Sequence, residues 1–257
     1  MKQISKTNAF PGEKFPYFIR NFRTMKLQSE LLSHLGWSDN IINKEAKERL
    51  AQQIADKVQD GQIVGAGSGS TVYMALFAIS ERIKEEKLNV KVIPSSIEIT
   101  MACSSLGIPV TGLFEDKPDW AFDGADEVDP KNSLIKGRGG ALFKEKLLIK
   151  SSQKNYILVD ESKIVTRLGM NFPVPIEVFP GALLYVESAL REMGINDITL
   201  RAAKGKDGPI ITENNNCILD VRFDHIPDDM EQKIKSITGV IDSGLFIGYD
   251  VEVLIAK

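Results

Sequence analysis

The chain has 257 residues, 43% of them hydrophobic and 26% charged, with a formal net charge of -3. This composition is typical of a soluble globular protein with one large domain or two unequal ones, and it gives no general drive toward nucleic acid or a membrane surface. No run approaches the ~18 apolar residues of a membrane span. Two cysteines outside any paired spacing favour the reducing cytoplasm.

The first 43 residues differ in texture from the rest of the chain. The first 25 of them carry several aromatic residues among scattered basic ones and lack the apolar core of a secretory signal. A transit peptide is disfavoured because Glu13 interrupts the segment and serines are few. We interpret residues 1–43 as an N-terminal extension of unknown role. Its first 25 residues are expected to be either an added arm that packs on the body or on a partner subunit, or an upstream extension before Met25.

Residues 44–171 alternate between helical patterns and short apolar runs. Helices are expected at residues 44–58, 72–87, in the segment that closes at Gly107, and at 141–150; strands are expected at 62–65, 90–93, 109–113, 120–122 and 156–159. Repeated strand–helix alternation predicts an α/β fold whose open, mainly parallel sheet has helices on both faces.

Polar loops follow the expected strands of this region. They span residues 65–71, 95–96, 123–126 and 160–163. In open parallel sheets, ligands bind beyond the carboxyl ends of the strands. The polar loops are therefore expected to converge on one common site.

From about residue 172 the pattern changes. Strands are expected at 176–178, 198–200, 210–212 and 218–221, helices at 182–193 and 228–237, and further strands near Val240 and Val251. The order β-α-β-β-α-β is that of ferredoxin-like folds. Residues 172–239 are thus predicted to form a smaller α+β lid domain, and residues 44–171 and 240–257 the larger α/β domain that carries the site.

The glycine-rich turn at residues 65–71 is a candidate anion site. It misses the dinucleotide pattern G-x-G-x-x-G, because position 70 is serine, and the nucleotide P-loop, because no lysine follows the glycines. Backbone N–H groups at a helix N-terminus, with the hydroxyls of Ser68, Ser70 and Thr71 around Gly69, would bind a phosphate monoester. The alternative is a tight turn whose hydroxyls only cap the helix.

Between Trp120 and Ile149 the chain collects groups that proton transfer next to a carbonyl requires. A carboxylate can act as the base, a lysine can stabilise an oxyanion, and further carboxylates can handle hydroxyl protons. The groups in question are Asp123, Asp126, Glu127, Lys136, Arg138 and Glu145, set among Gly124, Gly137, Gly139 and Gly140.

The acidic loop at residues 123–129 could also ligate magnesium, which prefers oxygen ligands. Its spacing matches no EF-hand loop, two basic residues are close in sequence, and the two histidines of the chain are isolated. No metal is therefore expected. A solvated turn accounts for Glu127 and Asp129, but less well for Asp123, which directly follows an apolar strand.

Glu145 is the strongest candidate for the base. Its helical neighbours at i−4, i−3, i+3 and i+4 are all apolar: Ala141, Leu142, Leu148 and Ile149. A carboxylate on such a stripe is partly desolvated, which raises its pKa from about 4.3 toward the range of a useful base. The alternative is a surface glutamate whose stem lies along the apolar stripe.

Taken in order, these motifs are similar to those of the type A ribose-5-phosphate isomerase family. The motifs are Gly67-Ser68-Gly69-Ser70-Thr71, Ser95-Ser96 with Thr100, Asp123-Gly124-Ala125-Asp126-Glu127, Lys136-Gly137-Arg138-Gly139-Gly140 with Glu145-Lys146, and Asp160-Glu161-Ser162-Lys163. The resemblance runs from about residue 44 to the C-terminus. It implies interconversion of ribose 5-phosphate and ribulose 5-phosphate through an enediolate in the non-oxidative pentose phosphate pathway. It also implies a reaction without metal or organic cofactor, in a homodimer or homotetramer.

The resemblance further implies a role for individual residues. Glu145 would move a proton between C1 and C2, and Asp123 would assist ring opening. Asp126 and Lys136 would handle the hydroxyl and the enediolate oxygens. The substrate-binding residues would be Ser68, Gly69, Ser70, Thr71, Asp123, Gly124, Ala125, Asp126, Lys136, Gly137, Arg138, Gly139 and Lys163.

Departures from the family pattern leave these groups in place. Ser68 stands where many relatives have threonine and keeps the hydroxyl. Arg138 interrupts the glycine run, so its backbone must fit without a positive φ. Asn215 replaces a glycine in the turn at residues 212–216, and because asparagine tolerates left-handed geometry, the turn is expected to survive.

Two other functional classes stay open. A non-catalytic sugar-phosphate sensor would need a DNA-binding module, and residues 1–43 show no clear helix-turn-helix. An amino-sugar-phosphate deaminase or a coenzyme A transferase of related fold is disfavoured by the spacing between Lys136, the glycines and Glu145.

Overall fold

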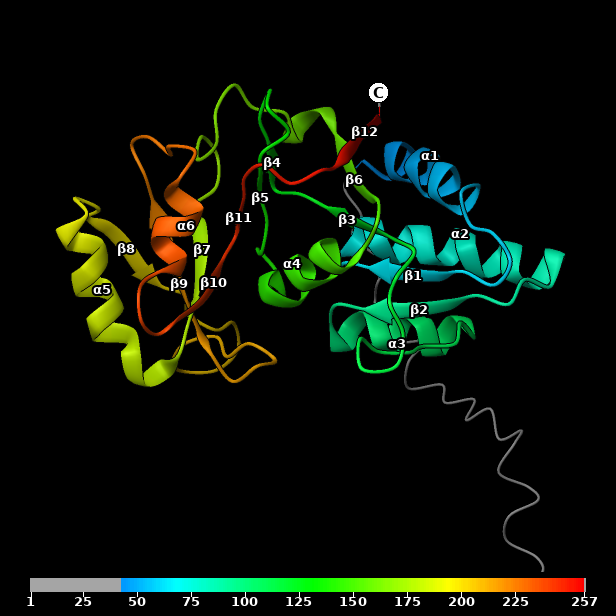
Figure 1. Ribbon diagram of the computed structural model, residues 1–257, viewed down its shortest axis with the longest axis horizontal. Coiled ribbons are helices and arrows are strands. Elements are labelled where there is room, and N and C mark those ends of the chain that lie inside the picture. Colours follow the sequence, from blue (N-terminus) through cyan, green and yellow to red (C-terminus); the bar gives the residue numbers. More distant parts are fainter. Residues whose placement is uncertain (1–42, 257) are drawn as a thin grey trace, which may run out of the picture.

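The computed structural model describes residues 43–256. A parallel sheet with its helices lies beside a smaller antiparallel unit (Figure 1). The predicted extension at residues 1–43 lies outside the described residues except for Asn43.

Five parallel strands form the central sheet, in the order β12-β6-β3-β1-β2. They are β1 (Ile63–Ala66), β2 (Lys91–Pro94), β3 (Trp120–Gly124), β6 (Asn155–Asp160) and β12 (Glu252–Ala256). Parallel neighbours need long crossover connections, which are usually helical. The predicted mainly parallel sheet is confirmed.

Helices cover both faces of this sheet, as predicted. They are α1 (Lys44–Ala55), α2 (Ser70–Glu86), α3 (Ile97–Leu106) and α4 (Leu142–Ser151). Side chains alternate between the two faces of a strand, so the contacts of β6 show which helices cover each face of the sheet. Tyr156 and Leu158 pack into the core that contains α1, α2 and α3, whereas Ile157 and Val159 pack with Ile149 of α4.

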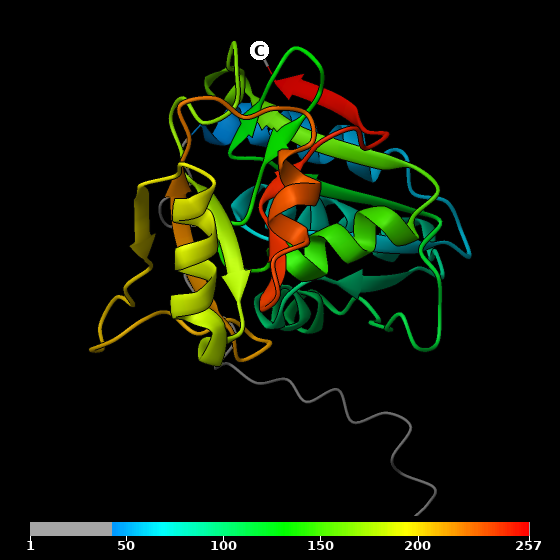
Figure 2. The ribbon, with the colours of Figure 1, turned by 60° about the vertical axis from the view of Figure 1, so that its left-hand side comes forward.

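Residues 174–243 form the antiparallel unit. Its sheet has the order β10-β7-β9-β8, built from β7 (Val174–Val178), β8 (Asp197–Leu200), β9 (Cys217–Arg222) and β10 (Val240–Ser243), with helices α5 (Leu183–Glu192) and α6 (Met230–Lys235). Val186 and Leu190 of α5 and Ile234 of α6 share one core with the strands. Figure 2 shows α5 lying along the strands of this sheet. The chain order β-α-β-β-α-β is the predicted ferredoxin-like one.

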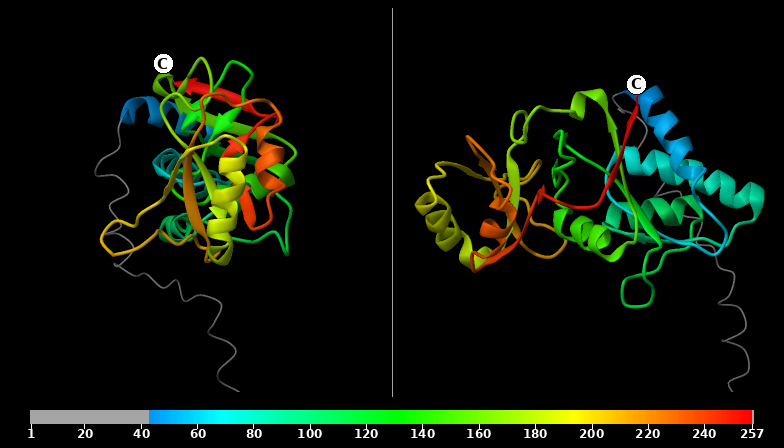
Figure 3. Two further views of the ribbon diagram at one scale, coloured as in Figure 1. Left: turned by 90° about the vertical axis from the view of Figure 1, so that its left-hand side faces the viewer. Right: turned by 45° about the horizontal axis from the view of Figure 1, so that its top comes forward.

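A third, short sheet lies between these two parts. It is antiparallel and consists of β4 (Glu127–Val128), β5 (Leu134–Ile135) and β11 (Leu245–Phe246), in the order β11-β5-β4. Because β11 follows β10 directly, the chain leaves the antiparallel unit through this sheet and then runs to β12 (Figure 3). The predicted boundary at residue 239 falls just before β10, which pairs with β7; the division into two domains stays a prediction.

Two expected strands are absent from the described residues. Residues 109–113 make only a bridge from Val110 to Val92, and residues 210–212 form no strand. Val110 is 46% exposed and Ile211 is 43% exposed, so these apolar runs do not enter a core. The helix expected at residues 228–237 is also shorter, because α6 covers only Met230–Lys235.

Candidate functional site

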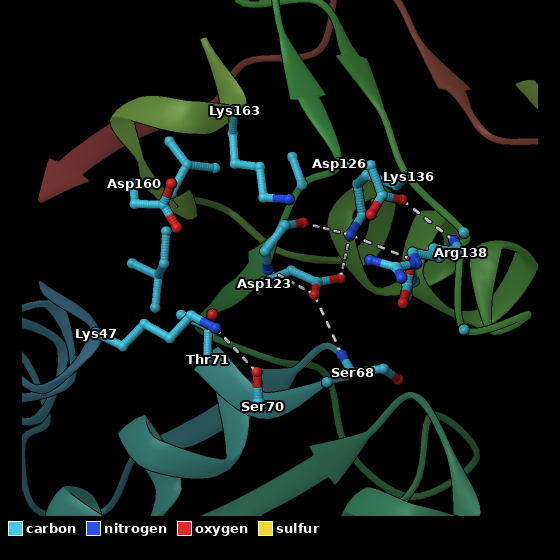
Figure 4. A pocket seen from close by; sticks show the side chains of 18 residues that line it. Lys47, Ser68, Ser70, Thr71, Asp123, Asp126, Lys136, Arg138, Asp160 and Lys163 are labelled. Atoms are coloured by element: carbon cyan, nitrogen blue, oxygen red, sulfur yellow. Dashed lines mark hydrogen bonds and ion pairs between the residues drawn. The ribbon is translucent and has the colours of Figure 1, made fainter. Parts of the chain in front are cut away.

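A cavity of about 430 Å³ lies at the carboxyl ends of β1, β3 and β6 (Figure 4). The loops after these strands line it, together with the start of α4. The structure brings together every catalytic and substrate-binding residue that the resemblance implied. They are Ser68, Gly69, Ser70, Thr71, Asp123, Gly124, Ala125, Asp126, Lys136, Gly137, Arg138, Gly139, Glu145 and Lys163.

Asp123 stands near the end of β3 and is 3% exposed. Its Oδ1 accepts hydrogen bonds from the backbone N–H of Gly124 at 2.7 Å and of Ser68 at 3.1 Å. Position 67 must be glycine, because a Cβ there would lie 1.8 Å from the Asp123 carboxyl carbon. The glycine-rich turn thus lets the chain pass close to this carboxylate.

Lys136 lies between two carboxylates. Its Nζ is 2.7 Å from Asp123 Oδ2 and 3.2 Å from Glu145 Oε2, and it donates a hydrogen bond to the Gly124 carbonyl at 2.6 Å. Lys136 is 3% exposed and Glu145 is 5% exposed. Glu145 is therefore a buried group, and its reading as a surface glutamate is wrong.

The electrostatics of these three groups suit proton transfer. Burial, and after it the negative charge of Asp123, raises the pKa of Glu145 to about 7, while the Lys136 ammonium acts in the opposite direction. Burial also raises the pKa of Asp123. Burial alone would lower the pKa of Lys136, but the charges of Asp123 and Glu145 hold it above its usual value. A carboxylate that titrates near neutral pH beside a permanent ammonium is well matched to general-base catalysis.

Asp126 and Arg138 border the cavity next to Lys136 (Figure 4). The backbone N–H of Arg138 donates to Asp126 Oδ2 at 3.2 Å. As expected, Arg138 has no positive φ; the left-handed positions of this loop are Gly137, with φ of 98°, and Gly140, with φ of 85°. The loop therefore turns at its glycines and accommodates the arginine between them.

The glycine-rich turn forms another end of the cavity. Helix α2 begins at Ser70, and its N-cap is Gly69 with φ of 93°. The N-cap glycine has no side chain, so no hydroxyl caps the helix from that position. The first N–H groups of a helix have no partner within the helix, so with the hydroxyls of Ser70 and Thr71 they form an anion-binding arrangement.

Two lysines also line this end. Lys47 of α1 donates from Nζ to Ser70 Oγ at 3.1 Å, and Lys163 follows β6. Burial lowers the pKa of Lys47 and the positive charge of Lys163 lowers it further, while Asp160 opposes both. An ammonium at a helix N-terminus, with a second one that lines the same cavity, is complementary to a phosphate.

Lys47 is a lining residue that the sequence reasoning missed. The signal was nevertheless present, because positions 47, 50, 51 and 54 share one face of α1. Leu50, Ala51 and Ile54 of that face are buried. A lysine on the same helix face as buried apolar residues points toward the interior, so it is a candidate for a binding site at that face.

The loop at residues 95–96 does not line the cavity, so one of the polar loops misses the common site. Ser95 is buried, and its hydroxyl is 2.7 Å from that of Ser68. Ser96 is the N-cap of α3 and accepts from the backbone N–H of Ile99 at 3.2 Å. This loop therefore contacts the glycine-rich turn without lining the cavity.

Glu127 corrects the expectation of a solvated turn. It is 0% exposed, and its carboxylate accepts hydrogen bonds from the backbone N–H groups of Gly169, Asn171 and Phe172 at 2.6, 2.5 and 2.8 Å. The Phe172 ring in turn lies 5.2 Å from the Lys163 ammonium. Glu127 therefore organises a loop that packs against a residue lining the cavity.

Within residues 43–256, no group of three or more histidine, cysteine or acidic residues is placed to hold a metal ion. The metal-free reaction implied by the resemblance stays a prediction. None of the described helices is long and apolar enough to cross a membrane.

Known proteins resemble this chain in sequence. The profile of the family described as Ribose 5-phosphate isomerase A (phosphoriboisomerase A) matches residues 91–257. The ribose-5-phosphate isomerase A of Thermosynechococcus vestitus is 40% identical over 224 residues, which cover 86% of this chain and 94% of that protein. The protein of the same name from Methanothermobacter thermautotrophicus is 42% identical over 204 residues, which cover 79% of this chain and 89% of that protein.

Solved structures resemble it in fold. The ribose 5-phosphate isomerase A of Methanocaldococcus jannaschii superposes with a TM-score of 0.81 at 39% identity, over 84% of this chain and 96% of that one. A D-ribose-5-phosphate isomerase in complex with phospho-erythronic acid superposes with a TM-score of 0.80 at 35% identity, over 84% of this chain and 96% of that one.

Proposed function

The chain belongs to the ribose 5-phosphate isomerase A family, and on this premise we propose how its residues interconvert ribose 5-phosphate and ribulose 5-phosphate. Membership of the family makes the protein an isomerase and sets aside the sensor, deaminase and transferase alternatives. The reaction moves one hydrogen between C2 and C1, so it requires a base and a group that stabilises an oxyanion.

We propose that the substrate phosphate binds at the start of α2. Its oxygens would accept from the backbone N–H groups and hydroxyls of Ser70 and Thr71. The ammonium groups of Lys47 and Lys163 would balance its charge. The hydrogen bond of 3.1 Å from Lys47 to Ser70 supports this arrangement, because it directs a cation toward the helix N-terminus.

Asp123 is proposed to open the cyclic form of the sugar. It would take the proton of the O1 hydroxyl as the bond between C1 and the ring oxygen breaks, and return the proton to that oxygen. The raised pKa of Asp123, which burial causes, supports such a relay, because the group can then hold a proton transiently.

Glu145 is proposed as the base that acts on the open-chain sugar. It takes the proton from C2, and the electron pair of that bond forms the C1–C2 double bond of an enediolate whose negative charge lies on O1. Lys136 stabilises this charge. Asp126 moves the O2 hydroxyl proton to O1, and Glu145 returns its proton to C1, which leaves the C2 ketone.

One observation carries this assignment. Glu145 is a buried carboxylate with a pKa of about 7, and its Oε2 lies 3.2 Å from the ammonium that would stabilise the enediolate. Base and oxyanion stabiliser thus adjoin one another at the cavity wall.

Replacing the base tests the proposal. Glu145→Gln keeps the size of the side chain but cannot take a proton, so kcat should fall by at least ~10²-fold. KM and the melting temperature should stay near wild type, which a coupled assay and circular dichroism would check. Near-normal turnover would transfer the role of base to another carboxylate, with Asp126 the leading candidate.

We further propose a homodimer or homotetramer in the cytoplasm. Phe179, Leu184 and Tyr185 of the antiparallel unit expose large apolar surfaces, which suit contact with a second copy. Cys103 and Cys217 are free and buried, as is usual in a reducing compartment. Light scattering at assay concentration should give a multiple of the chain mass, and the mass of a single chain would contradict the oligomer.

We also infer that residues 172–239 act as a lid. Glu213 supports this role, because it pairs with Lys144 of α4 at 2.6 Å and accepts from the backbone N–H of Ile97 at the start of α3. Substrate should slow hydrogen exchange around residues 212–216. Unchanged exchange in the presence of substrate would count against a lid.

A further inference from the structure

Helix α4 carries three consecutive charged residues that point in different directions, because neighbouring side chains on a helix are ~100° apart. Glu145 lines the cavity, and Lys144 pairs with Glu213 at 2.6 Å. Lys146 is only 2% exposed and its ammonium faces the antiparallel unit. The reaction proposed above does not use this buried lysine.

The Lys146 ammonium has three acceptors. Its Nζ donates to Glu231 Oε1 at 2.8 Å, to Asp242 Oδ1 at 2.7 Å and to the Ser243 carbonyl at 2.8 Å. An ammonium has three donors, so all of them are used. Because Glu231 belongs to α6 and the other two acceptors to β10, one side chain ties α4 to two elements of the antiparallel unit.

The acceptors are themselves held in place. Glu231 Oε1 also accepts from the Tyr249 hydroxyl at 2.8 Å, and Glu231 Oε2 accepts from the backbone N–H of Ile247 at 2.8 Å. Asp242 Oδ1 accepts from the backbone N–H of Ser243 at 2.8 Å. The carboxylates around Lys146 therefore cannot turn without breaking other hydrogen bonds.

Residues 242–246, which include Asp242 and Ser243, also contact Lys136. The backbone N–H of Lys136 donates to the Gly244 carbonyl at 2.9 Å, and a Cβ at position 244 would lie 2.1 Å from the Lys136 carbonyl oxygen. The ring of Phe246 has the Lys146 ammonium 4.7 Å and the Lys136 ammonium 5.7 Å from its centroid. Residues 242–246 thus contact both the lysine that adjoins Glu145 and the helix that carries Glu145.

We propose that Lys146 is a positioning residue for the isomerase reaction. Its ion cluster with Glu231 and Asp242 fixes α4 against residues 242–246 and so holds Glu145 at its distance of 3.2 Å from Lys136 Nζ. The proposal rests on the assignment of Glu145 as the base. A displacement of about 1 Å in a reacting group can cost ~10²-fold in rate. A buried ion cluster is weak support for stability, since apolar replacements are often as stable, whereas it does fix an orientation.

Lys146→Met tests the proposal, because methionine has a similar length and no charge. We expect kcat for ribose 5-phosphate to fall by ~10-fold or more while KM changes by less than ~2-fold, because the phosphate end of the cavity is untouched. The matched control is Lys233→Met, which removes a surface lysine paired with Asp229. The control should leave both constants unchanged. A folded Lys146→Met enzyme with wild-type kcat would overturn the proposal.

A second variant separates positioning from stability, because Lys146→Met leaves Glu231 and Asp242 without their buried cation. The triple variant Lys146→Met/Glu231→Gln/Asp242→Asn removes all three charges and should recover melting temperature. If Lys146 positions the base, kcat of the triple variant stays low. If kcat recovers together with melting temperature, Lys146 serves stability alone and the proposal is wrong.

A double-mutant cycle shows whether Lys146 acts through Glu145. In the Glu145→Gln background, Lys146→Met should change the residual rate by less than ~2-fold, since there is no base left to position. Equal losses in both backgrounds would contradict the proposal. The two assignments can be tested separately. Wild-type turnover in Glu145→Gln would contradict the assignment of Glu145 as the base. An inactive Glu145→Gln together with a fully active Lys146→Met would contradict only the positioning role of Lys146.

Discussion

The cavity has a proposed reaction end around Glu145 and a proposed phosphate end at the start of α2. The two ends differ in how deeply their charged groups are buried. At the reaction end, Asp123, Lys136 and Glu145 are each 5% exposed or less, and their charged atoms lie against one another. At the phosphate end, Lys47 and Lys163 are half-buried, and the helix N-terminus supplies neutral N–H donors.

The difference separates reactivity from binding. Burial raises the pKa of Glu145 into the neutral range, which makes it useful as a base. The more open phosphate end keeps donors and cations available to an anion that enters from water. Substitutions at the reaction end should therefore change kcat, and substitutions at the phosphate end should change KM.

Lys136→Gln, at the reaction end, should cause the largest change in kinetics. Loss of a donor to a developing oxyanion costs ~10²–10³-fold in kcat, and steady-state kinetics with ribose 5-phosphate would measure it. Lys154→Gln, which removes a surface lysine paired with Glu252, is the matched control and should be neutral. A rise in KM with unchanged kcat would show that Lys136 contributes to substrate binding and not to the chemical step. It would contradict the proposed difference between the two ends.

At the phosphate end, Ser70→Ala with Thr71→Ala should raise KM by ~10²-fold or more. The two hydroxyls would donate to a charged phosphate, and such hydrogen bonds contribute ~1.5 kcal/mol or more each. The value of kcat should change by less than ~3-fold. Ser105→Ala on α3, whose hydroxyl donates to the Ala102 carbonyl, is the control. An unchanged KM in the double variant would sink the phosphate assignment.

The smallest effect is the pH dependence of the wild-type enzyme. Because the base must be ionised and the pKa of Glu145 is about 7, kcat/KM should fall as pH drops through that value, by about 10-fold from pH 8 to pH 6. The acidic limb should disappear in Glu145→Gln. A profile that stays flat down to pH 5 would show that burial does not shift the base as described.

Much of this site could be predicted from the sequence, because its groups follow strands of a parallel sheet. Asp123 lies near the end of β3, directly after the apolar residues 120–122, and Ser70 opens the helix after β1. In such a sheet both positions must lie at the same edge. Glu145 could be found because all its helical neighbours at the relevant spacings are apolar.

What the sequence missed depends on contacts between distant segments. Glu127 reads as part of a polar turn, yet it is buried because the backbone of residues 169–172 turns to meet it. Strands β4, β5 and β11 have two residues each, which is too short for a periodic pattern. Conversely, the apolar runs around Val110 and Ile211 predict strands, although these two side chains are exposed.

Proton exchange at the substrate carbon tests the central claim most directly. Wild type and Glu145→Gln would be incubated in D₂O with ribulose 5-phosphate, and deuterium uptake at C1 would be followed by proton NMR. If Glu145 moves the proton between C1 and C2, wild type incorporates deuterium, and the variant does so at least ~10²-fold more slowly. Uptake at the wild-type rate in Glu145→Gln would contradict the assignment of Glu145 as the base.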